Sequence, residues 1–245
     1  MMAFLEISDL SKRFGGLTAV NHVSFELAQG EVVALLGPNG SGKTTVLNMI
    51  SGLLPVSGGT ITLQGKRLSG LPAHRIAHAG VARTFQLVRV LPSLTVSENI
   101  LAAILFRAGH TSEQEARIEA ADLLAAVGLE GRGGEKATDL TYIDQKRMEL
   151  ARALASRPKL LLLDEWLAGL NPSELRIGID LIAKLNARGI TILLVEHVMD
   201  AVRALCPRAV VMNAGSKLAD GPTADVLRDP EVVRAYLGEP HAAVA

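Results

Sequence analysis

The sequence predicts an α/β fold in which a block of helices interrupts a sheet of mostly parallel strands. Continuous apolar runs, such as Val32–Leu36 and Thr191–Val195, are typical of strands that are buried on both faces of a sheet. Strand and helix patterns alternate towards both ends of the chain, whereas the region near residues 88–157 carries helical signals only. We therefore expect an α/β core with a helical insertion.

Turn signals divide the N-terminal region into strands. Residues 24–27 alternate between polar and apolar side chains, and Gln29-Gly30 forms a turn before the run Val32–Leu36. Another short strand is expected at 60–63, between Gly58-Gly59 and Gln64-Gly65. Further along, apolar strands are expected at 159–163 and at Thr191–Val195.

Capping signals mark the helices. The capping boxes are Thr95 with Glu98, before the apolar run 100–106, and Ser112 with Glu115, before 116–127. A third helix is expected at about 144–155, ending before Pro158. A fourth is expected near Pro172–Ala187, because Asn171 and Glu174 are suited to its cap and third position.

Composition excludes several classes of protein. The chain has 245 residues, of which 49% are hydrophobic and 20% charged, so it can bury a core and disorder is not expected. Its net charge is zero, so nothing global favours nucleic-acid binding, and its one cysteine, Cys206, forms no internal disulfide. We see no signal-peptide pattern, and the longest apolar runs, 160–163 and 190–195, are far below the roughly 20 residues of a membrane span. A membrane role would therefore require partner subunits.

The segment Gly37-Pro-Asn-Gly-Ser-Gly-Lys-Thr44 matches the phosphate-binding pattern G-x-x-x-x-G-K-[ST]. It follows a buried strand and precedes a plausible helix at 45–51, so an ordinary glycine-rich turn is the weaker interpretation. Glycines let the backbone wrap around an anion, and the helix N-terminus adds partial positive charge. Lys43 would neutralise the β- and γ-phosphates of a nucleotide, and Thr44 would bind Mg²⁺.

Two carboxylates, Asp164 and Glu165, follow the apolar strand that ends at Leu163. Alone, such a pair is more often a turn, but ligand sites of parallel sheets lie at the carboxyl ends of the strands. Beside a phosphate loop, we expect Asp164 to hold Mg²⁺ and Glu165 to polarise the attacking water. His197 follows Thr191–Val195 in the same way, so we expect a polar contact to the γ-phosphate rather than a structural role.

Together these residues resemble the nucleotide-binding subunits of ABC transporters over nearly the whole chain, residues 4–238. The resemblance implies a P-loop NTPase core with an N-terminal antiparallel β subdomain and an inserted α-helical subdomain. In these terms the core is residues 1–87 and 158–238, the helical subdomain is 88–157, and 239–245 is a loose tail.

The resemblance also implies roles for further residues. Phe14 would stack on the adenine, although a buried core aromatic is the competing interpretation. Gln86 is similar to the family's Q-loop glutamine, which senses Mg²⁺ and the water, and Ala168-Gly-Leu-Asn171 is similar to its D-loop. The expected nucleotide-binding residues are Phe14, Asn39, Gly40, Ser41, Gly42, Lys43, Thr44, Thr45, Thr141 and Ile143. The expected catalytic residues are Glu165, His197, Gln86 and Lys43, and the expected metal-binding residues are Thr44, Gln86 and Asp164.

Five segments are similar to the branched-chain amino acid importer branch of the family: Ala82-Arg-Thr-Phe-Gln86, residues 91–100, Ala168-Gly-Leu-Asn-Pro172, Val195-Glu-His197 and residues 229–238. The resemblance implies ATP and Mg²⁺ as cofactors, and a dimer of two such chains in which each signature motif completes the other chain's site. Transmembrane permease subunits and, indirectly, a solute-binding protein would be partners, and no nucleic acid would be. The chain would lie peripherally on the cytoplasmic face of the inner membrane.

The sequence departs from the family's pattern in two places, the signature motif and the residue after the acidic pair. The signature, usually close to L-S-G-G-Q, reads Leu140-Thr-Tyr-Ile-Asp144, so Ile143 replaces a glycine and Asp144 adds a carboxylate. We expect that charge to repel the partner's phosphate. Trp166 stands where a proline usually follows the acidic pair, for which local packing is the only account that the sequence offers.

Three interpretations of the function remain. The first is an ATPase that powers uptake of amino acids or related small molecules. The second, motivated by Ile143 and Asp144, is a half with weak hydrolysis of its own in a heterodimer; tolerance of the change by this branch is nearly as good an account. The third is an ABC ATPase of repair or translation, which such a short chain disfavours.

Overall fold

The computed structural model describes residues 3–107, 109 and 112–237; the expected tail, 239–245, and the last residue of segment 229–238 lie outside them. The described strands are β1 (Leu5–Phe14), β2 (Leu17–Leu27), β3 (Val32–Leu36), β4 (Gly58–Leu63), β5 (Lys66–Arg67), β6 (Val81–Arg83), β7 (Leu160–Asp164), β8 (Thr191–Val195), β9 (Arg208–Asn213) and β10 (Ser216–Pro222). The described helices are α1 (Lys43–Ile50), α2 (Ala73–His78), α3 (Val96–Phe106), α4 (Glu113–Ala126), α5 (Tyr142–Ala155), α6 (Pro172–Ala187), α7 (Met199–Leu205), α8 (Thr223–Val226) and α9 (Pro230–Leu237), with a 3₁₀ turn at Ala137–Asp139.

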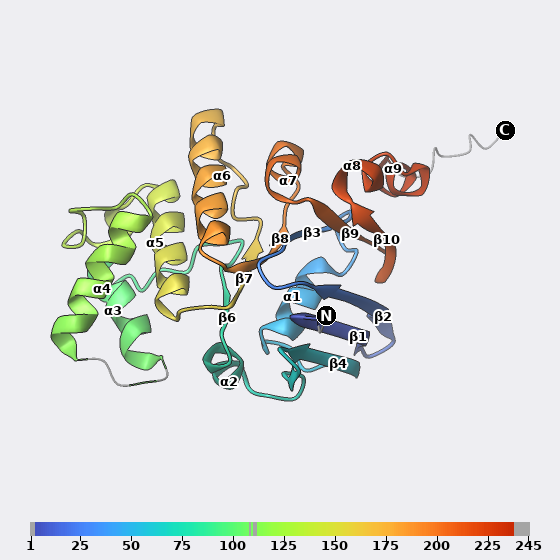
Figure 1. The fold of residues 1–245 in the computed structure, drawn as a ribbon, viewed down its shortest axis with the longest axis horizontal. Helices are drawn as coiled ribbons and strands as arrows, with labels where there is room; N and C mark the ends of the chain where they lie inside the picture. The colour runs from blue at the N-terminus through green and yellow to red at the C-terminus, as the bar shows by residue number, and fades with distance from the viewer. Residues whose placement is uncertain (1–2, 108, 110–111, 238–245) are drawn as a thin grey trace.

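A six-stranded sheet in the order β10-β9-β3-β8-β7-β6 forms the centre of the molecule. Its strands are parallel except for the antiparallel edge strand β10. Helix α1 lies on one side of this sheet, and α6 and α7 lie on the other (Figure 1). The carboxyl ends of β3, β7 and β8 therefore meet at one edge, where we expected the site.

The alternation of side chains along these strands explains why they are apolar throughout. Val33 and Leu35 pack into the hydrophobic cluster that contains α1, whereas Ala34 and Leu36 pack into the cluster that contains α6. Successive side chains of a strand point to opposite faces, so a sheet covered on both faces needs apolar residues at every position.

A second, antiparallel sheet in the order β2-β1-β4-β5 lies beside the central one. Leu5, Ile7 and Leu10 of β1 share a buried cluster with Val46 and Leu47 of α1, so α1 is enclosed between the two sheets. This packing fixes the helix whose N-terminus follows the phosphate loop.

Helices α3, α4 and α5 pack together at the side of the central sheet, away from β1 and β2 (Figure 1). Ile100 and Leu124 of this group belong to the same hydrophobic cluster as Leu161 and Ile182 of the core. The helical group is therefore joined to the core by continuous packing. No described helix has the length and the apolar character needed to cross a membrane.

Both predicted capping boxes are present, at Thr95 with Glu98 and at Ser112 with Glu115, and α6 has the predicted bounds Pro172–Ala187. The third helix begins at Tyr142, with Thr141 as its cap. The short elements α2 and β6, between the first strands and the helical group, were not anticipated.

Candidate nucleotide-binding and hydrolysis site

The phosphate-binding segment forms a tight turn between β3 and α1. Gly37 has φ of 143°, and a Cβ atom there would lie 2.2 Å from the carbonyl oxygen of Met212. Gly42, the N-cap of α1, has φ of 104°, and a Cβ there would lie 2.7 Å from the carbonyl oxygen of Ala19. Both positions require glycine, and because no side chain caps α1, its first N–H groups are available to an anion.

The other expected phosphate-loop residues lie around this turn. Asn39, Gly40 and Thr44 are exposed, Thr45 is half-buried, and Ser41 is buried. The hydroxyl of Ser41 has no hydrogen-bond partner among the described residues.

Lys43 reaches back over the loop. Its ammonium donates to the carbonyl oxygens of Gly37 (2.6 Å) and Pro38 (2.9 Å). Burial lowers the pKa of Lys43, and the charges of Glu165 and Asp164 act in the opposite direction. A phosphate at this place would therefore supply the anion that a half-buried ammonium lacks.

Glu165 follows β7 in a left-handed backbone conformation, with φ of 50°. Such a conformation costs about 1–3 kcal/mol at a residue other than glycine and is found where surrounding contacts enforce it. The backbone N–H of Glu165 donates to the carbonyl oxygen of Val195 at 2.8 Å, which anchors the turn to β8.

The structure brings Gln86, Glu165 and His197 together from three distant segments. The amide of Gln86 donates to Oε2 of Glu165 at 2.7 Å, and Nδ1 of His197 lies 3.8 Å from the same oxygen. Gln86 and His197 are exposed, so the half-buried carboxylate of Glu165 has polar groups on two sides that solvent can reach.

Asp164 is buried and forms an ion pair with a residue that was not predicted from the sequence to belong to the site. Arg83 of β6 donates to Oδ2 of Asp164 at 2.7 Å. The same guanidinium donates to Oδ1 of Asn48 (2.6 Å) and to the hydroxyl of Ser51 (3.2 Å), both at the end of α1. One guanidinium thus joins the acidic strand to the phosphate-loop helix, and it leaves Oδ1 of Asp164 without a contact from Arg83.

Tyr236 of α9 is a second unanticipated contact. Its hydroxyl oxygen accepts a hydrogen bond from the backbone N–H of Gly37 at 2.7 Å. Burial raises the pKa of Tyr236, and the bond from Gly37 acts against that shift. The two residues are 199 positions apart in the sequence, so no local pattern reveals this support of the phosphate loop.

Phe14 lies at the end of β1 with 44% of its surface exposed, so the interpretation as a buried core aromatic is wrong. The ammonium of Lys12 lies 5.0 Å from the centroid of its ring. An exposed ring is compatible with stacking on a base, which stays a prediction.

The altered signature lies at the N-terminus of α5. Thr141 caps the helix: its hydroxyl accepts from the N–H of Asp144 and donates to that residue's Oδ2 at 2.7 Å. Ile143 is half-buried.

Asp144 does not present a free negative charge, which corrects the expectation of repulsion. Its carboxylate is paired with Arg132 at 2.6 Å and with Arg147 at 3.1 Å. Burial would raise the pKa of Asp144, but hydrogen bonds from Thr141 and Arg132 outweigh it and the pKa is lowered. The charge is therefore kept and neutralised within the subunit.

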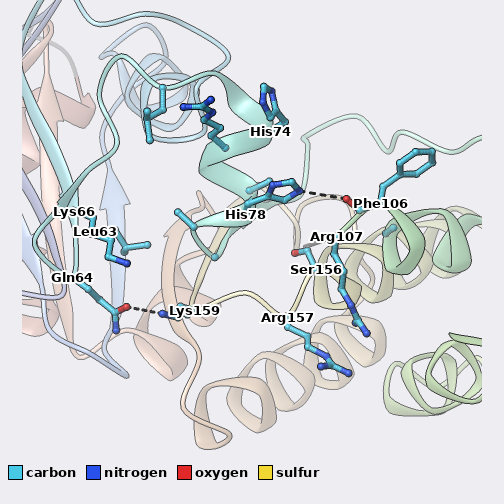
Figure 2. A pocket seen from close by; sticks show the side chains of 16 residues that line it. Leu63, Gln64, Lys66, His74, His78, Phe106, Arg107, Ser156, Arg157 and Lys159 are labelled. Atoms are coloured by element: carbon cyan, nitrogen blue, oxygen red, sulfur yellow. Dashed lines mark hydrogen bonds between the residues drawn. The ribbon is translucent and has the colours of Figure 1, made fainter. Parts of the chain in front are cut away.

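A cavity of about 770 Å³ separates α2 from the end of α3 and from the loop before β7 (Figure 2). Nε2 of His78 lies 3.4 Å from the backbone carbonyl oxygen of Phe106, and Lys159 donates to Oε1 of Gln64 at 2.8 Å. Among the described residues the lining includes basic side chains and no carboxylate, although Arg107 and Arg157 each pair with Glu119, which does not line the cavity. These basic residues are Lys66, His74, Arg75, His78, Arg107, Arg157 and Lys159.

A neighbouring cavity of about 360 Å³ shares Ala77, Ala103 and Ser156 with the first and extends to Phe85, next to Gln86. The apolar run 100–106 contains both buried and exposed side chains. Ile100 and Ile104 are buried in the insertion, whereas Leu105 and Phe106 are exposed, and Phe106 lines the first cavity.

A phosphate loop at the end of β3 and an acidic pair at the end of β7 define a P-loop ATPase of the α/β class. Comparisons with known proteins refine this assignment. Residues 20–168 match the family described as ABC transporter, and residues 216–242 match the family described as branched-chain amino acid ATP-binding cassette transporter.

Relatives and solved structures agree with these matches. The chain is 44% identical to the high-affinity branched-chain amino acid transport ATP-binding protein LivG of Salmonella typhimurium, over 96% of this chain and 98% of that protein. The ADP conformation of MJ1267, an ATP-binding cassette of an ABC transporter, superposes with a TM-score of 0.88 at 31% identity, covering 98% of this chain and all of that one. The dimeric, post-hydrolysis cassette MJ0796 bound to ADP and Pi has a TM-score of 0.81 at 26% identity, covering 89% and 98%.

The chain therefore belongs to the ATP-binding subunits of ABC transporters and is an ATPase of that family. The predicted fold, with an antiparallel N-terminal sheet and a helical insertion, is confirmed.

Proposed function

We propose that this chain powers the uptake of branched-chain or other amino acids, or of related small molecules, as the ATPase subunit of an importer. The observation that carries the solute class is the match of residues 216–242 to the branched-chain amino acid family, because this segment lies outside the general ABC match. The relatives named for branched-chain amino acid transport support the same class.

The test is transport by the reconstituted complex. The chain is purified with the permease subunits and the binding protein that are made with it, and ATP-dependent uptake of labelled leucine into proteoliposomes is measured. We expect uptake that Lys43→Ala abolishes, because the mutant lacks the cation for the γ-phosphate. Uptake of only an unrelated solute, such as urea or an aromatic acid, would overturn the amino-acid assignment but not the ATPase.

ATP would bind at the N-terminus of α1, with its phosphates on the N–H groups of residues 39–45 and its adenine on Phe14. The donor set also suits Mg²⁺, which takes one or two protein oxygens in addition to phosphates and water. Thr44 offers an exposed hydroxyl, and Asp164 has one carboxylate oxygen that Arg83 does not occupy. With Gln86, these residues would hold the ion, which supplies charge neutralisation to the phosphates when bound.

Hydrolysis would proceed by in-line attack of water on the γ-phosphorus. The carboxylate of Glu165 accepts a hydrogen bond from Gln86 and would orient the water and receive its proton. His197, which is close to the same carboxylate, would contact the γ-phosphate. Lys43 would leave the carbonyl oxygens of the loop and stabilise the charge that develops on the phosphate.

A second ATPase subunit would complete the site. The N-terminus of α5 carries Thr141 and Ile143 at its surface end, and we propose that it faces the phosphates bound by the partner chain. The dimeric cassette MJ0796 supports a dimer of this kind. A heterodimer with one weak site remains the second candidate. Only Ile143 now supports it, because the charge of Asp144 is neutralised.

The permease subunits would dock on the cavities beside Gln86, and the chain would lie peripherally on the cytoplasmic face of the inner membrane. Exposed Phe106 and the basic lining of the larger cavity offer apolar contact and positive charge for a segment of the permease (Figure 2). The solute-binding protein would act on the other side of the membrane and would have no contact with this chain.

A further inference from the structure

Lys146, in the second turn of α5, is buried, with 1% of its surface exposed. Its ammonium contacts no carboxylate of the described residues; it donates to the carbonyl oxygens of Trp166 (2.8 Å) and Ala168 (2.7 Å), with a longer contact to that of Glu165 (3.5 Å). Burial lowers the pKa of Lys146, and the charges of Glu196 and Glu149 oppose the shift. A buried ammonium is costly, so a site that keeps one needs its hydrogen bonds.

Trp166 returns a hydrogen bond to the same residue. Its indole N–H donates to the carbonyl oxygen of Lys146 at 3.2 Å, and the ring is 1% exposed. Gly178 of α6 leaves room for this loop, since a Cβ atom there would lie 2.5 Å from Leu167 and 3.3 Å from Trp166. Lys146 of α5 and Trp166, in the segment after the acidic residues, therefore each donate a hydrogen bond to the backbone carbonyl oxygen of the other.

The same loop is held from its other side. The backbone N–H of Leu167 donates to Oε1 of Glu196 at 2.6 Å, and Glu196 immediately precedes His197. Burial raises the pKa of Glu196, and the bond from Leu167 acts against that shift. Lys146 and Glu196 thus fix residues 165–168 between α5 and the end of β8.

This loop carries Glu165, whose left-handed backbone is imposed by its surroundings. The ammonium of Lys146 also lies 5.0 Å from the ring centroid of Tyr142, in the first turn of α5. One side chain therefore links the segment that would face the partner's ATP to the loop that carries this chain's own catalytic carboxylate.

We propose that Lys146 is a positioning residue for ATP hydrolysis, which with Trp166 ties the signature helix α5 to the loop that carries Glu165. The inference rests on the proposed role of Glu165. When a partner's nucleotide pulls on the N-terminus of α5, the movement reaches Glu165 through the carbonyl oxygens that Lys146 holds.

The experiment compares Lys146→Met, Lys146→Arg and Trp166→Phe with the wild type. Turnover is expressed per chain that binds a fluorescent ATP analogue, so that misfolded protein does not count. We expect Lys146→Met to keep analogue affinity and KM but to lower kcat per binding chain by about 10–100-fold, as misplacement of a catalytic group does. Lys146→Arg, which keeps donors, should recover part of kcat, and Trp166→Phe should lose less than Lys146→Met.

Lys184→Met, on the exposed face of α6, is the matched control and should leave kcat unchanged. A purely structural role predicts fewer binding chains, each with normal kcat, and that result overturns the proposal. If neither Lys146 variant folds, Trp166→Phe decides: normal kcat per binding chain refutes it. Failure of the proposed role of Glu165 is distinguishable, because Glu165→Gln would then keep normal turnover.

Discussion

The carboxylate of Glu165 is held by the amide of Gln86 and lies 3.8 Å from His197, so it is oriented before any nucleotide arrives. Such preorganisation is what general-base catalysis requires, because the carboxylate need not be reordered when the water attacks. Glu165→Gln keeps the shape and the polar contacts but removes the charge.

We expect Glu165→Gln to bind ATP normally and to lose about 10²–10⁴-fold in turnover. Because ATP would persist, the mutant should accumulate as a closed dimer, seen by gel filtration in ATP. Glu130→Gln, an exposed position, is the control. Persistent turnover in Glu165→Gln would show that another group activates the water.

The reactivity of the Cys206 thiol tests whether the core around it opens in the native protein. It is the chain's one cysteine, and burial raises its pKa from 9.0 to about 12. The thiolate is the reactive form, so raising the pKa suppresses alkylation at any pH below it. We expect iodoacetamide to leave the native protein unmodified from pH 7 to 9, by intact mass, whereas the urea-unfolded chain should react faster as pH rises. Rapid native labelling would show that the core opens at α7.

At the scale of elements, local signals predicted the helices well and the contacts between elements poorly. Thr95, Ser112 and Asn171 each have a glutamate three residues later, and this local pattern predicts the start of a helix. The glycine pattern predicts the phosphate loop in the same local way. Arg83 and Asp164 are 81 positions apart, and Gly37 and Tyr236 are 199 apart, so neither pair has a local signature. Which basic residue neutralises a buried carboxylate is decided by tertiary packing.

The bond between α9 and the phosphate loop has a measurable consequence. Tyr236→Phe keeps the ring but removes the acceptor for the N–H of Gly37, a loss of about 0.5–1.5 kcal/mol for a neutral hydrogen bond. If the bond orders the loop for phosphate, ATP affinity should fall by up to about tenfold. Isothermal titration measures this, with Val233→Ala on the same helix as the control. Unchanged affinity would mean that the loop is ordered without α9.

The segment from β6 to α3 connects the core to the helical group, and Gln86 lies within it. Gln86→Ala removes the bond to Glu165 but leaves the phosphate loop intact. We expect fewer solute molecules transported per ATP in the reconstituted complex, with a smaller effect on ATP affinity. Equal transport per ATP before and after the change would contradict a coupling role.

For the whole molecule, one hydrophobic cluster runs from α3 and α4 through α5 to the core strand β7 and to α6. Packed interiors transmit displacement because they have few voids to absorb it. A movement imposed on the helical group by the permease, or on α5 by a partner chain, is therefore expected to reach the hydrolysis loop rather than dissipate at a hinge.

The altered signature tests how two such molecules work together. In a dimer the N-terminus of α5 would meet the partner's phosphates, and a helix N-terminus favours an anion by about 0.3–1 kcal/mol at an exposed site. Ile143 adds bulk where glycine would let the backbone approach. Asp144 is neutralised by Arg132 and Arg147, so bulk, and not charge, is the remaining obstacle.

Ile143→Gly alone should therefore raise ATP turnover of a homodimer severalfold, while leaving little change in a mixed dimer whose partner has a regular signature. Asp144→Gln alone should give no gain and should lower the melting temperature, because it removes the partner of two arginines and leaves them less well neutralised. Turnover of both dimers, with each single mutant and the double mutant, separates the two residues. A gain from Asp144→Gln would restore charge repulsion as the cause. No gain from Ile143→Gly in either dimer would show that this branch tolerates the change, and the case for an asymmetric pair would fall.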